Sequence, residues 1–227
     1  MRMQESKIGL LTDLIARARK AGADAADAVI FESESLSVSW RLGKKEGVER
    51  EESHDLGLRT LVGKGQAIVS STDLKTSTLQ NLIDQAITMA RNAPADPYCE
   101  IPSTESSPLP QTDLELYDPR EISPEELFDL AAETEDAARS VEGVTNSEGA
   151  EATKNKGQIA LANSAGFADE YSVTSFGASV SVIAGQDTAM ERDYEYSSTR
   201  FFEDLMAPSA IGRSAGEKAV ARQNPQK

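Results

Sequence analysis

The chain has 227 residues, of which 39% are hydrophobic, 27% charged and 5% aromatic, a composition typical of a globular protein with an aliphatic core. Its 23 basic and 38 acidic residues give a formal net charge of −15, which argues against binding to a phosphate backbone. A single cysteine excludes an internal disulfide, and no apolar run reaches signal-peptide or membrane-span length. We therefore expect a cytoplasmic protein that contacts neither nucleic acid nor a membrane.

The first part of the chain predicts a helix, four strands and a second helix. Apolar residues at three- and four-residue spacing indicate helices, and period-two alternation indicates strands. Gly63-Lys64-Gly65 predicts a hairpin turn, and Ser77 with Gln80 predicts a capping box at the second helix. The expected ranges are helix 6–21, strands 27–42 and 48–53, a hairpin over 56–70, and helix 77–92.

Residues 94–122 are rich in proline and serine and predict an extended linker. The run Ser123-Pro124-Glu125-Glu126 then predicts a helix start with a capping box. After that helix, we expect strands at 146–154, 158–163, 167–184 and 187–198, with a turn at 155–157, and a helix at 209–222. In the last strand, Met190, Arg192, Tyr194 and Tyr196 are predicted to share one face.

The two parts repeat one outline of a helix, antiparallel strands and a helix, which predicts an α+β fold. We expect antiparallel sheets flanked by helices in two similar sub-domains, at residues 1–93 and 123–227, joined by the linker 94–122. Sequence identity between the two parts is not evident, so an internal duplication is a hypothesis that the order of strands can test.

Residues 57–74, GLRTLVGKGQAIVSSTDL, resemble the TldD/PmbA family, and the PmbA (TldE) branch more than the TldD branch. The resemblance extends over most of the chain, although the matching residues are structural in type. The family is associated with a two-subunit, zinc-dependent peptidase system, and it also bears the older name modulator of DNA gyrase. Because a C-terminal domain follows in the family, the resemblance implies that this chain is an N-terminal portion.

Zinc catalysis within these residues is not expected. The resemblance implies a His-Glu-x-x-x-His zinc motif in the TldD branch, and this chain has only one histidine, His54, and one thiol, Cys99. The run Ser53-His54-Asp55 suggests a hydrolase triad, but neighbouring residues on a strand point to opposite faces. Cys99 as a nucleophile would have only His54 to activate it.

Other polar groups have structural interpretations that we favour. The acidic residues Glu49, Glu51 and Glu52 fit a solvated strand better than a cation site. Residues 63–65 lack a phosphate-binding motif. Arg41 and Arg59 are expected to pair with carboxylates, although a peptide carboxylate is an alternative. We therefore predict no catalytic, cofactor-binding or metal-binding residue in this chain.

Three hypotheses for function follow from the resemblance. The chain is a metal-free scaffold in a PmbA-like subunit, which helps to form a peptide-admitting chamber with a zinc-bearing TldD-like partner or by self-association. Alternatively, the parent protein is a metallopeptidase whose zinc motif lies beyond residue 227, or the chain is a non-enzymatic interaction module. The long strands at 167–184 and 187–198 could accept an extended, unfolded peptide at an exposed edge.

Overall fold

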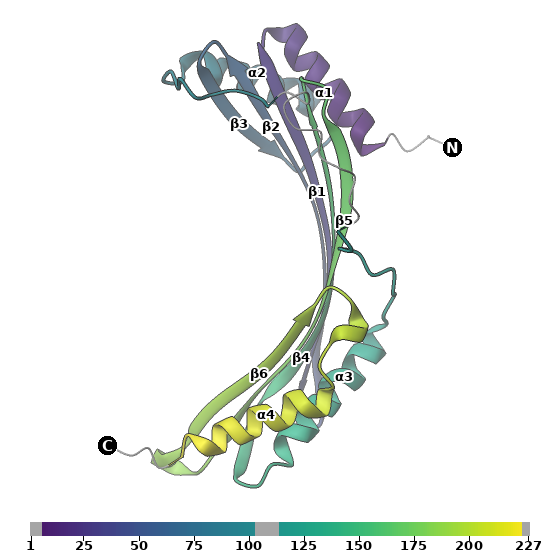
Figure 1. Ribbon diagram of the computed structural model, residues 1–227, viewed down its shortest axis with the longest axis vertical. Helices are drawn as coiled ribbons and strands as arrows, with labels where there is room; N and C mark the ends of the chain where they lie inside the picture. Colours follow the sequence, from purple (N-terminus) through teal and green to yellow (C-terminus); the bar gives the residue numbers. More distant parts are fainter. Residues whose placement is uncertain (1–5, 103–113, 224–227) are drawn as a thin grey trace. The chain divides into compact units, whose positions relative to one another are not determined.

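The computed structural model describes residues 6–102 and 114–223, which form four α-helices and six β-strands (Figure 1). Two short 3-10 helices, Asp187–Ala189 and Phe202–Asp204, flank the last strand. In chain order, the elements are α1 (Lys7–Ala21), β1 (Ala25–Arg41), β2 (Lys44–Val62), β3 (Gly65–Ser71), α2 (Thr76–Asn92), α3 (Pro124–Arg139), β4 (Val144–Asn163), β5 (Ala168–Ala184), β6 (Glu191–Thr199) and α4 (Pro208–Ala221).

The strands form an antiparallel sheet in the order β3-β2-β1-β4-β5-β6, so the α+β prediction is confirmed. Each half of the chain has the order helix, three strands, helix. The strand order also repeats, because each half adds its second and third strands outward from the central β1–β4 pair. This match is what an internal duplication predicts.

The prediction of four strands in each half is wrong, because each half contains one long strand where two shorter strands are predicted. β2 runs without a break through the predicted gap at 54–55. β4 likewise runs through 155–157, where a turn was predicted. Turn-favouring residues such as Asn155 and Gly157 are held extended by pairing with neighbouring strands, which overrides their local preference.

The chain forms two compact units. Among the described residues, unit 1 comprises 6–33, 52–102, 114 and 157–172, and unit 2 comprises 34–51, 115–156 and 173–223. Each unit therefore includes the tip of a hairpin from the other half of the chain: β1–β2 enters unit 2, and β4–β5 enters unit 1. The proposed sub-domain boundaries at 93 and 123 stay a prediction.

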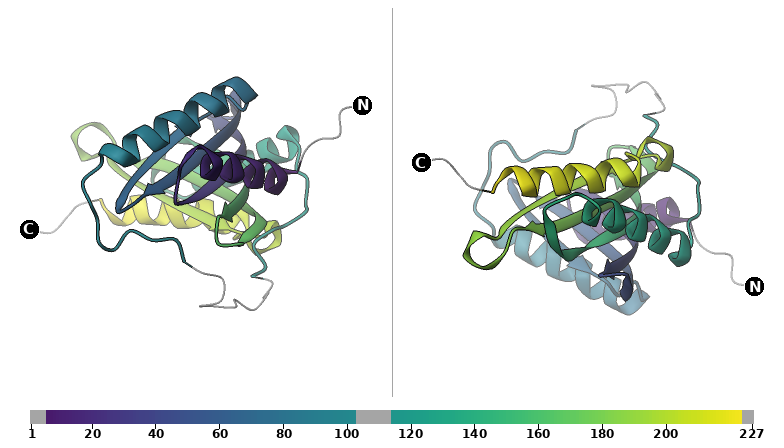
Figure 2. Two further views of the ribbon diagram at one scale, coloured as in Figure 1. Left: turned by 90° about the horizontal axis from the view of Figure 1, so that it is seen from above. Right: turned by 90° about the horizontal axis from the view of Figure 1, so that it is seen from below.

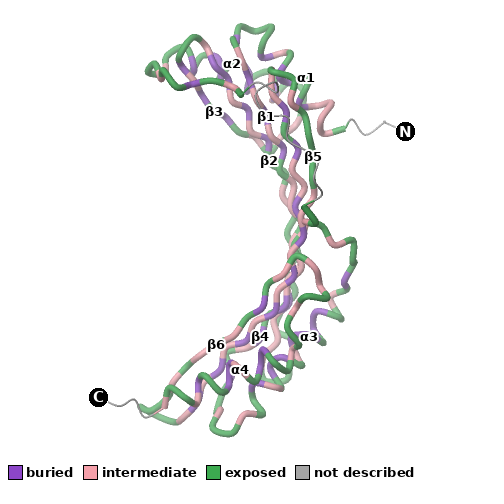
Figure 3. The backbone as a smooth tube through the Cα atoms, viewed as in Figure 1, coloured by how far each residue is buried: buried purple, intermediate pink, exposed green. Residues whose placement is uncertain are grey.

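Each unit has its own aliphatic core between helices and sheet. In unit 1, Leu14 and Ile83 from α1 and α2 pack with Ala160 and Ala162 from β4. In unit 2, residues of α3 and α4 pack with Val38 from β1. Buried and exposed residues alternate along the strands, so each unit keeps one sheet face toward its helices (Figure 3).

Most of the predicted helix ends are confirmed. Ser6 Oγ accepts the N–H of Gly9 at the start of α1, and Gly22 ends that helix with φ of 113°. Both hydrogen bonds of the capping box between Ser123 and Glu126 are present in α3. The capping box predicted at Ser77 and Gln80 is wrong, because α2 begins one residue earlier.

At α2, the carboxylate of Asp73 replaces the predicted capping box. It accepts the N–H of Lys75 at 3.1 Å and the hydroxyl of Thr78 at 2.8 Å. These bonds to Thr78 and Lys75 lower the pKa of Asp73 below its ordinary value. The start of α2 is therefore stabilised by a residue that precedes the helix.

The predicted linker at 94–122 lies partly outside the described residues, at 103–113. Its described ends form no helix or strand and are held against the protein. Leu116 O accepts the N–H of Thr174 at 3.0 Å, and the carboxylate of Asp118 accepts the N–H of Phe202 at 2.9 Å. This end of the segment is therefore a fixed part of unit 2.

In unit 2, α4 packs against β6, and charged side chains link the two elements (Figure 2). Lys218 and Ser214 on α4 donate to the carboxylate of Glu195 at 2.7 and 2.6 Å, and the N–H of Tyr196 donates at 3.1 Å. Together these donors lower the pKa of Glu195 from its ordinary 4.5 to about 2.

Acid should therefore weaken the attachment of α4. Because the pKa of Glu195 is lower in the folded protein, its contribution to stability is full above pH 4.5 and is lost as the pH falls toward 2. After allowance for solvent screening, we expect the free energy of unfolding to fall by about 1 kcal/mol from this group. Urea titrations of Glu195→Gln should show a shallower decline over this range than the native chain. Glu217→Gln, an exposed change on the same helix, is the control, and parallel curves for Glu195→Gln and the native chain would contradict the assignment.

Candidate functional site

Unit 2 has one sheet face that its helices leave uncovered. On β5, Val180 and Val182 are buried in the helix-side core, so the alternating residues Ser179 and Ser181 lie on the opposite face. The β5–β6 register pairs Ser179 with Tyr196 and Ser181 with Tyr194, and it places Arg192 opposite Ile183. This register confirms that Arg192, Tyr194 and Tyr196 share a face, whereas Met190, predicted to join them, precedes β6 and lies outside the paired strand. Both tyrosines are 60% exposed, and their rings stack at 6.4 Å.

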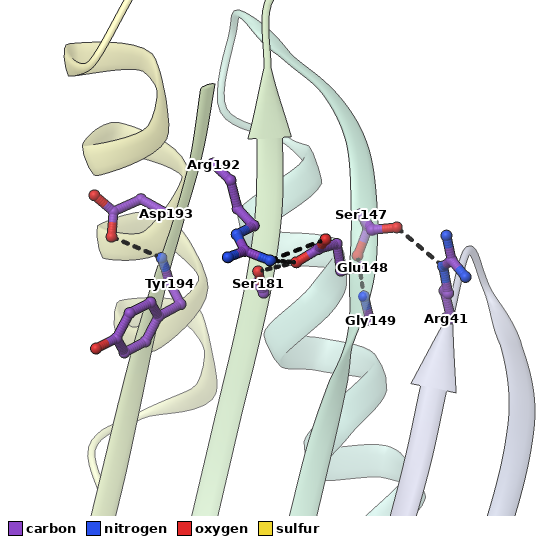
Figure 4. A network of polar contacts seen from close by, with 8 residues as sticks. All are labelled: Arg41, Ser147, Glu148, Gly149, Ser181, Arg192, Asp193 and Tyr194. Atoms are coloured by element: carbon purple, nitrogen blue, oxygen red, sulfur yellow. Dashed lines mark hydrogen bonds and ion pairs between the residues drawn. The ribbon is translucent and has the colours of Figure 1, made fainter. Parts of the chain in front are cut away.

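A polar network lies on this face and centres on Glu148 of β4 (Figure 4). Its carboxylate accepts the hydroxyl of Ser181 at 2.7 Å and an N–H of Arg192 at 3.2 Å. The hydrogen bond from Ser181 and the ion pair with Arg192 outweigh burial and lower the pKa of Glu148, with a further contribution from the charge of Arg41. Glu148 is therefore a charged, fixed acceptor that orients Arg192.

Gly149 explains why Glu148 lies on this face. Along β4, Ser147, Ala150 and Ala152 are buried, so the strict alternation breaks between 147 and 150. Gly149 has φ of 113°, and a Cβ there would lie 3.0 Å from the carbonyl oxygen of Trp40. The break is characteristic of a β-bulge, in which one extra residue re-aims a side chain. The strand predicted at 146–154 does not include this bulge.

A cavity of about 470 Å³ opens beside the network, within the size range of small-ligand pockets. Its charged lining comprises Glu46, Glu148, Glu151 and Arg192. The rest of the wall is mixed: serine hydroxyls from β1 and β5 and the side chain of Tyr194 lie beside apolar residues such as Trp40 and Val180. The arrangement can hold a polar or positively charged group.

Unit 1 has an uncovered sheet face of different character. A Cβ on Gly57 would lie 3.2 Å from Val29, which places Val29 on the face opposite the core, and Phe31 follows by alternation. Ile68 pairs with Arg59 on the same face. Phe31 and Ile68 are 42% and 68% exposed, and Arg59 on the same face is ion-paired with Asp27.

The single histidine belongs to an ion-pair group in unit 1. His54 Nδ1 lies 3.4 Å from Glu32, whose other carboxylate oxygen lies 2.7 Å from Lys7. Although burial opposes it, hydrogen bonding and charge from Lys7 and His54 lower the pKa of Glu32. The hydroxyl of Ser53 contacts Ser33 at 2.9 Å instead of His54. Ser53, His54 and Asp55 thus do not assemble into a triad.

The remaining predicted candidates lie in structural settings. Cys99 is buried, and Glu49, Glu51 and Glu52 lie on the exposed part of β2. Arg59 donates to Asp27, which raises the pKa of Arg59. Arg41 donates to the carbonyl oxygen of Ser147 at 3.1 Å, and not to a carboxylate as predicted.

Residues 63–65 form the predicted hairpin turn between β2 and β3. The N–H of Gly63 donates to Asp24 at 2.6 Å, and the carbonyl oxygen of Lys64 accepts the N–H of Asp96 at 2.8 Å. A Cβ on Gly65 would lie 2.1 Å from the carbonyl oxygen of Ala90, so only glycine fits this approach to α2. The turn is thus held by the carboxylate of Asp24 and by the backbone N–H of Asp96.

The described residues do not fit a zinc ion. No group of three or more His, Cys, Asp or Glu side chains within 6–102 and 114–223 is placed to hold a metal. Likewise, no helix in these ranges is long and apolar enough to cross a membrane.

Comparisons with known proteins assign the family. Residues 26–90 match the model for PmbA/TldA metallopeptidase domain 1, and residues 117–223 match the model for the PmbA/TldA metallopeptidase central domain. The chain is 35% identical over 211 residues to the metalloprotease PmbA homolog of Haemophilus influenzae. This alignment covers 92% of the chain and 47% of that relative. It is 32% identical over 205 residues to metalloprotease PmbA of Escherichia coli O157:H7, and this alignment covers 90% of the chain and 46% of that relative. The chain thus spans about half the length of these relatives.

Solved structures share the fold. A protein from Bacteroides thetaiotaomicron, described as a modulator of DNA gyrase, superposes with a TM-score of 0.88 at 22% identity, over 100% of this chain and 52% of that one. TldE from Thermococcus kodakarensis superposes with a TM-score of 0.76 at 16% identity, over 92% of this chain and 47% of that one. With two domain models of one family matched in order along the sequence, this chain belongs to the PmbA/TldD metallopeptidase family.

Proposed function

We propose that this chain is the scaffold part of a PmbA-like subunit in a zinc-dependent TldD/PmbA-type peptidase system. It admits unfolded peptide and positions it, and a zinc-bearing TldD-like partner supplies the hydrolytic centre. The bound zinc would activate water for peptide hydrolysis in that partner. The residues of this chain bind and align peptide in the cytoplasm, without nucleic acid or membrane.

The observation that carries the peptide-binding role is the exposed edge of β2 in unit 2. β3 pairs with β2 only as far as Leu56, and residues 44–51 lie beyond the end of that pairing. All of these residues are exposed. Such an edge can pair with an extended peptide through backbone hydrogen bonds, which accept almost any sequence.

The edge of β6 is less suited to peptide pairing, although this strand was one of the predicted candidates. The N–H of Tyr194 donates to its neighbour Asp193 at 2.8 Å, and the N–H of Tyr196 donates to Glu195 at 3.1 Å. These side chains occupy donors that a peptide would need. On β5, residues 176–184 pair with β6 and lie between two strands.

The exposed apolar side chains on the uncovered sheet face of unit 1 support the proposal of a protein partner. Ile68 is the most exposed of them and can be changed with little effect on folding. We expect Ile68→Glu to weaken association with the TldD-like subunit of the same organism at least tenfold, as measured by sedimentation velocity. Met89→Glu, on an exposed position of α2, should leave the affinity unchanged. Native affinity for Ile68→Glu, or no association of the native chain, would contradict this interface.

A further inference from the structure

We propose that the cavity on the uncovered sheet face of unit 2 is a subsite for a positively charged side chain of the bound peptide. The inference rests on the proposed peptide-binding function and adds a substrate class to it, namely extended peptides that carry lysine or arginine. Glu46 and Glu151 supply the charge, and Tyr194 supplies an aromatic wall.

The charges that line the cavity favour a cation. Three carboxylates, Glu46, Glu148 and Glu151, face one guanidinium, Arg192. Glu148 and Arg192 neutralise one another through their ion pair at 3.2 Å. The neighbouring Arg41 donates to the carbonyl oxygen of Ser147 and does not line the cavity, although its charge reaches Glu148 and offsets part of the negative charge. The excess negative charge therefore comes from Glu46 and Glu151, both exposed.

The shape and chemistry of the cavity also suit an alkylammonium or guanidinium group. A volume of about 470 Å³ holds a long side chain, and serine hydroxyls from two strands can accept hydrogen bonds from its donors. Tyr194 is 60% exposed and stacks against Tyr196, so its ring is available for a cation–π contact. The hydrogen-bonded network of Glu148, Ser181 and Arg192 gives the cavity a fixed wall.

The cavity is connected to the proposed peptide edge through Glu46. This residue lies on β2, within the exposed residues 44–51, and also lines the cavity. A peptide strand added beside β2 would direct every second side chain to the same sheet face as the cavity. Glu151 and Tyr194 lie on strands two and four places from β2, about 5 Å per strand, so backbone pairing at β2 would hold one part of the peptide and a further part, continuing across the sheet face, would place a basic residue in the cavity.

The test is a fluorescence-anisotropy titration of the 227-residue chain with labelled, unstructured twelve-residue peptides. One peptide contains a central pair of lysines in a serine–alanine background, and the matched peptide contains glutamines at those positions. We expect the lysine peptide to bind about three- to tenfold more tightly, the range for one or two exposed ion pairs. The variant Glu46→Gln/Glu151→Gln should remove this preference, so that the two peptides bind with equal affinity.

A control variant separates the subsite from the general acidity of the chain. Glu142→Gln/Glu217→Gln removes the same charge from exposed positions of unit 2 outside the cavity and should keep the preference for lysine. Equal binding of the two peptides to the native chain would overturn the subsite alone. An equal loss of preference in both variants would also overturn it. If neither peptide binds, the proposed peptide-binding function fails together with the subsite.

Discussion

Replacing Glu135 by alanine is expected to lower the free energy of unfolding by about 3 kcal/mol. The side chain of Glu135 is fully buried on α3. Its two carboxylate oxygens accept the N–H groups of Leu42 and Gly43 at 2.9 and 3.1 Å. These are the two residues of the β1–β2 turn, with φ of 50° and 75°. The substitution leaves two turn donors without their acceptor and opens a cavity beneath them.

Urea denaturation of Glu135→Ala against the native chain measures this effect. Glu133→Ala, an exposed change on the same helix, is the control and should alter stability by less than about 0.5 kcal/mol. The physical reason for the large effect is that Glu135 fixes a hairpin from the first half of the chain onto a helix from the second half. Similar stabilities for the two variants would show that the turn does not depend on this carboxylate.

The second large effect is expected where α3 and α4 pack together. A Cβ on Gly212 would lie 2.2 Å from the carbonyl oxygen of Thr134, and one on Gly216 would lie 2.6 Å from the side chain of Val141. Alanine is the better helix former by about 1 kcal/mol. We nevertheless expect Gly212→Ala to destabilise the protein by about 2 kcal/mol, because the helices must separate to admit the methyl group.

Thermal unfolding followed by circular dichroism tests this expectation. Gly47→Ala is a suitable control, because no atom lies within 4 Å of a Cβ built there, and it should leave the midpoint nearly unchanged. A rise in midpoint for Gly212→Ala would mean that helix propensity outweighs the close approach of α3 and α4.

Local signals in the sequence predicted much of this fold. The Ser123–Glu126 capping box and the Gly22 helix end depend on residues within one turn, and both are present. Alternation predicted the shared face of Tyr194 and Tyr196, which the strand register confirms. These features needed no knowledge of distant parts of the chain.

The features that sequence reasoning missed depend on contacts between distant residues. β4 continues through 155–157 because neighbouring strands hold it, and Glu135 is buried because the β1–β2 turn supplies its donors. Alternation along the strand does not predict Glu148 as the centre of the polar network, because the bulge at Gly149 breaks that alternation. A glycine within a polar strand was the available signal for that bulge. The four-residue spacing of Gly212 and Gly216 was likewise a signal for close helix packing.

The central claim is that this chain admits peptide and that a partner cleaves it. The most direct measurement follows the cleavage of an unfolded polypeptide by the chain alone, by its zinc-loaded TldD-like partner alone, and by the two together. We predict rapid cleavage only in the mixture, and its loss when zinc is removed by a chelator. Cleavage by this chain without the partner, or cleavage by the partner that the chain does not change, would contradict the claim.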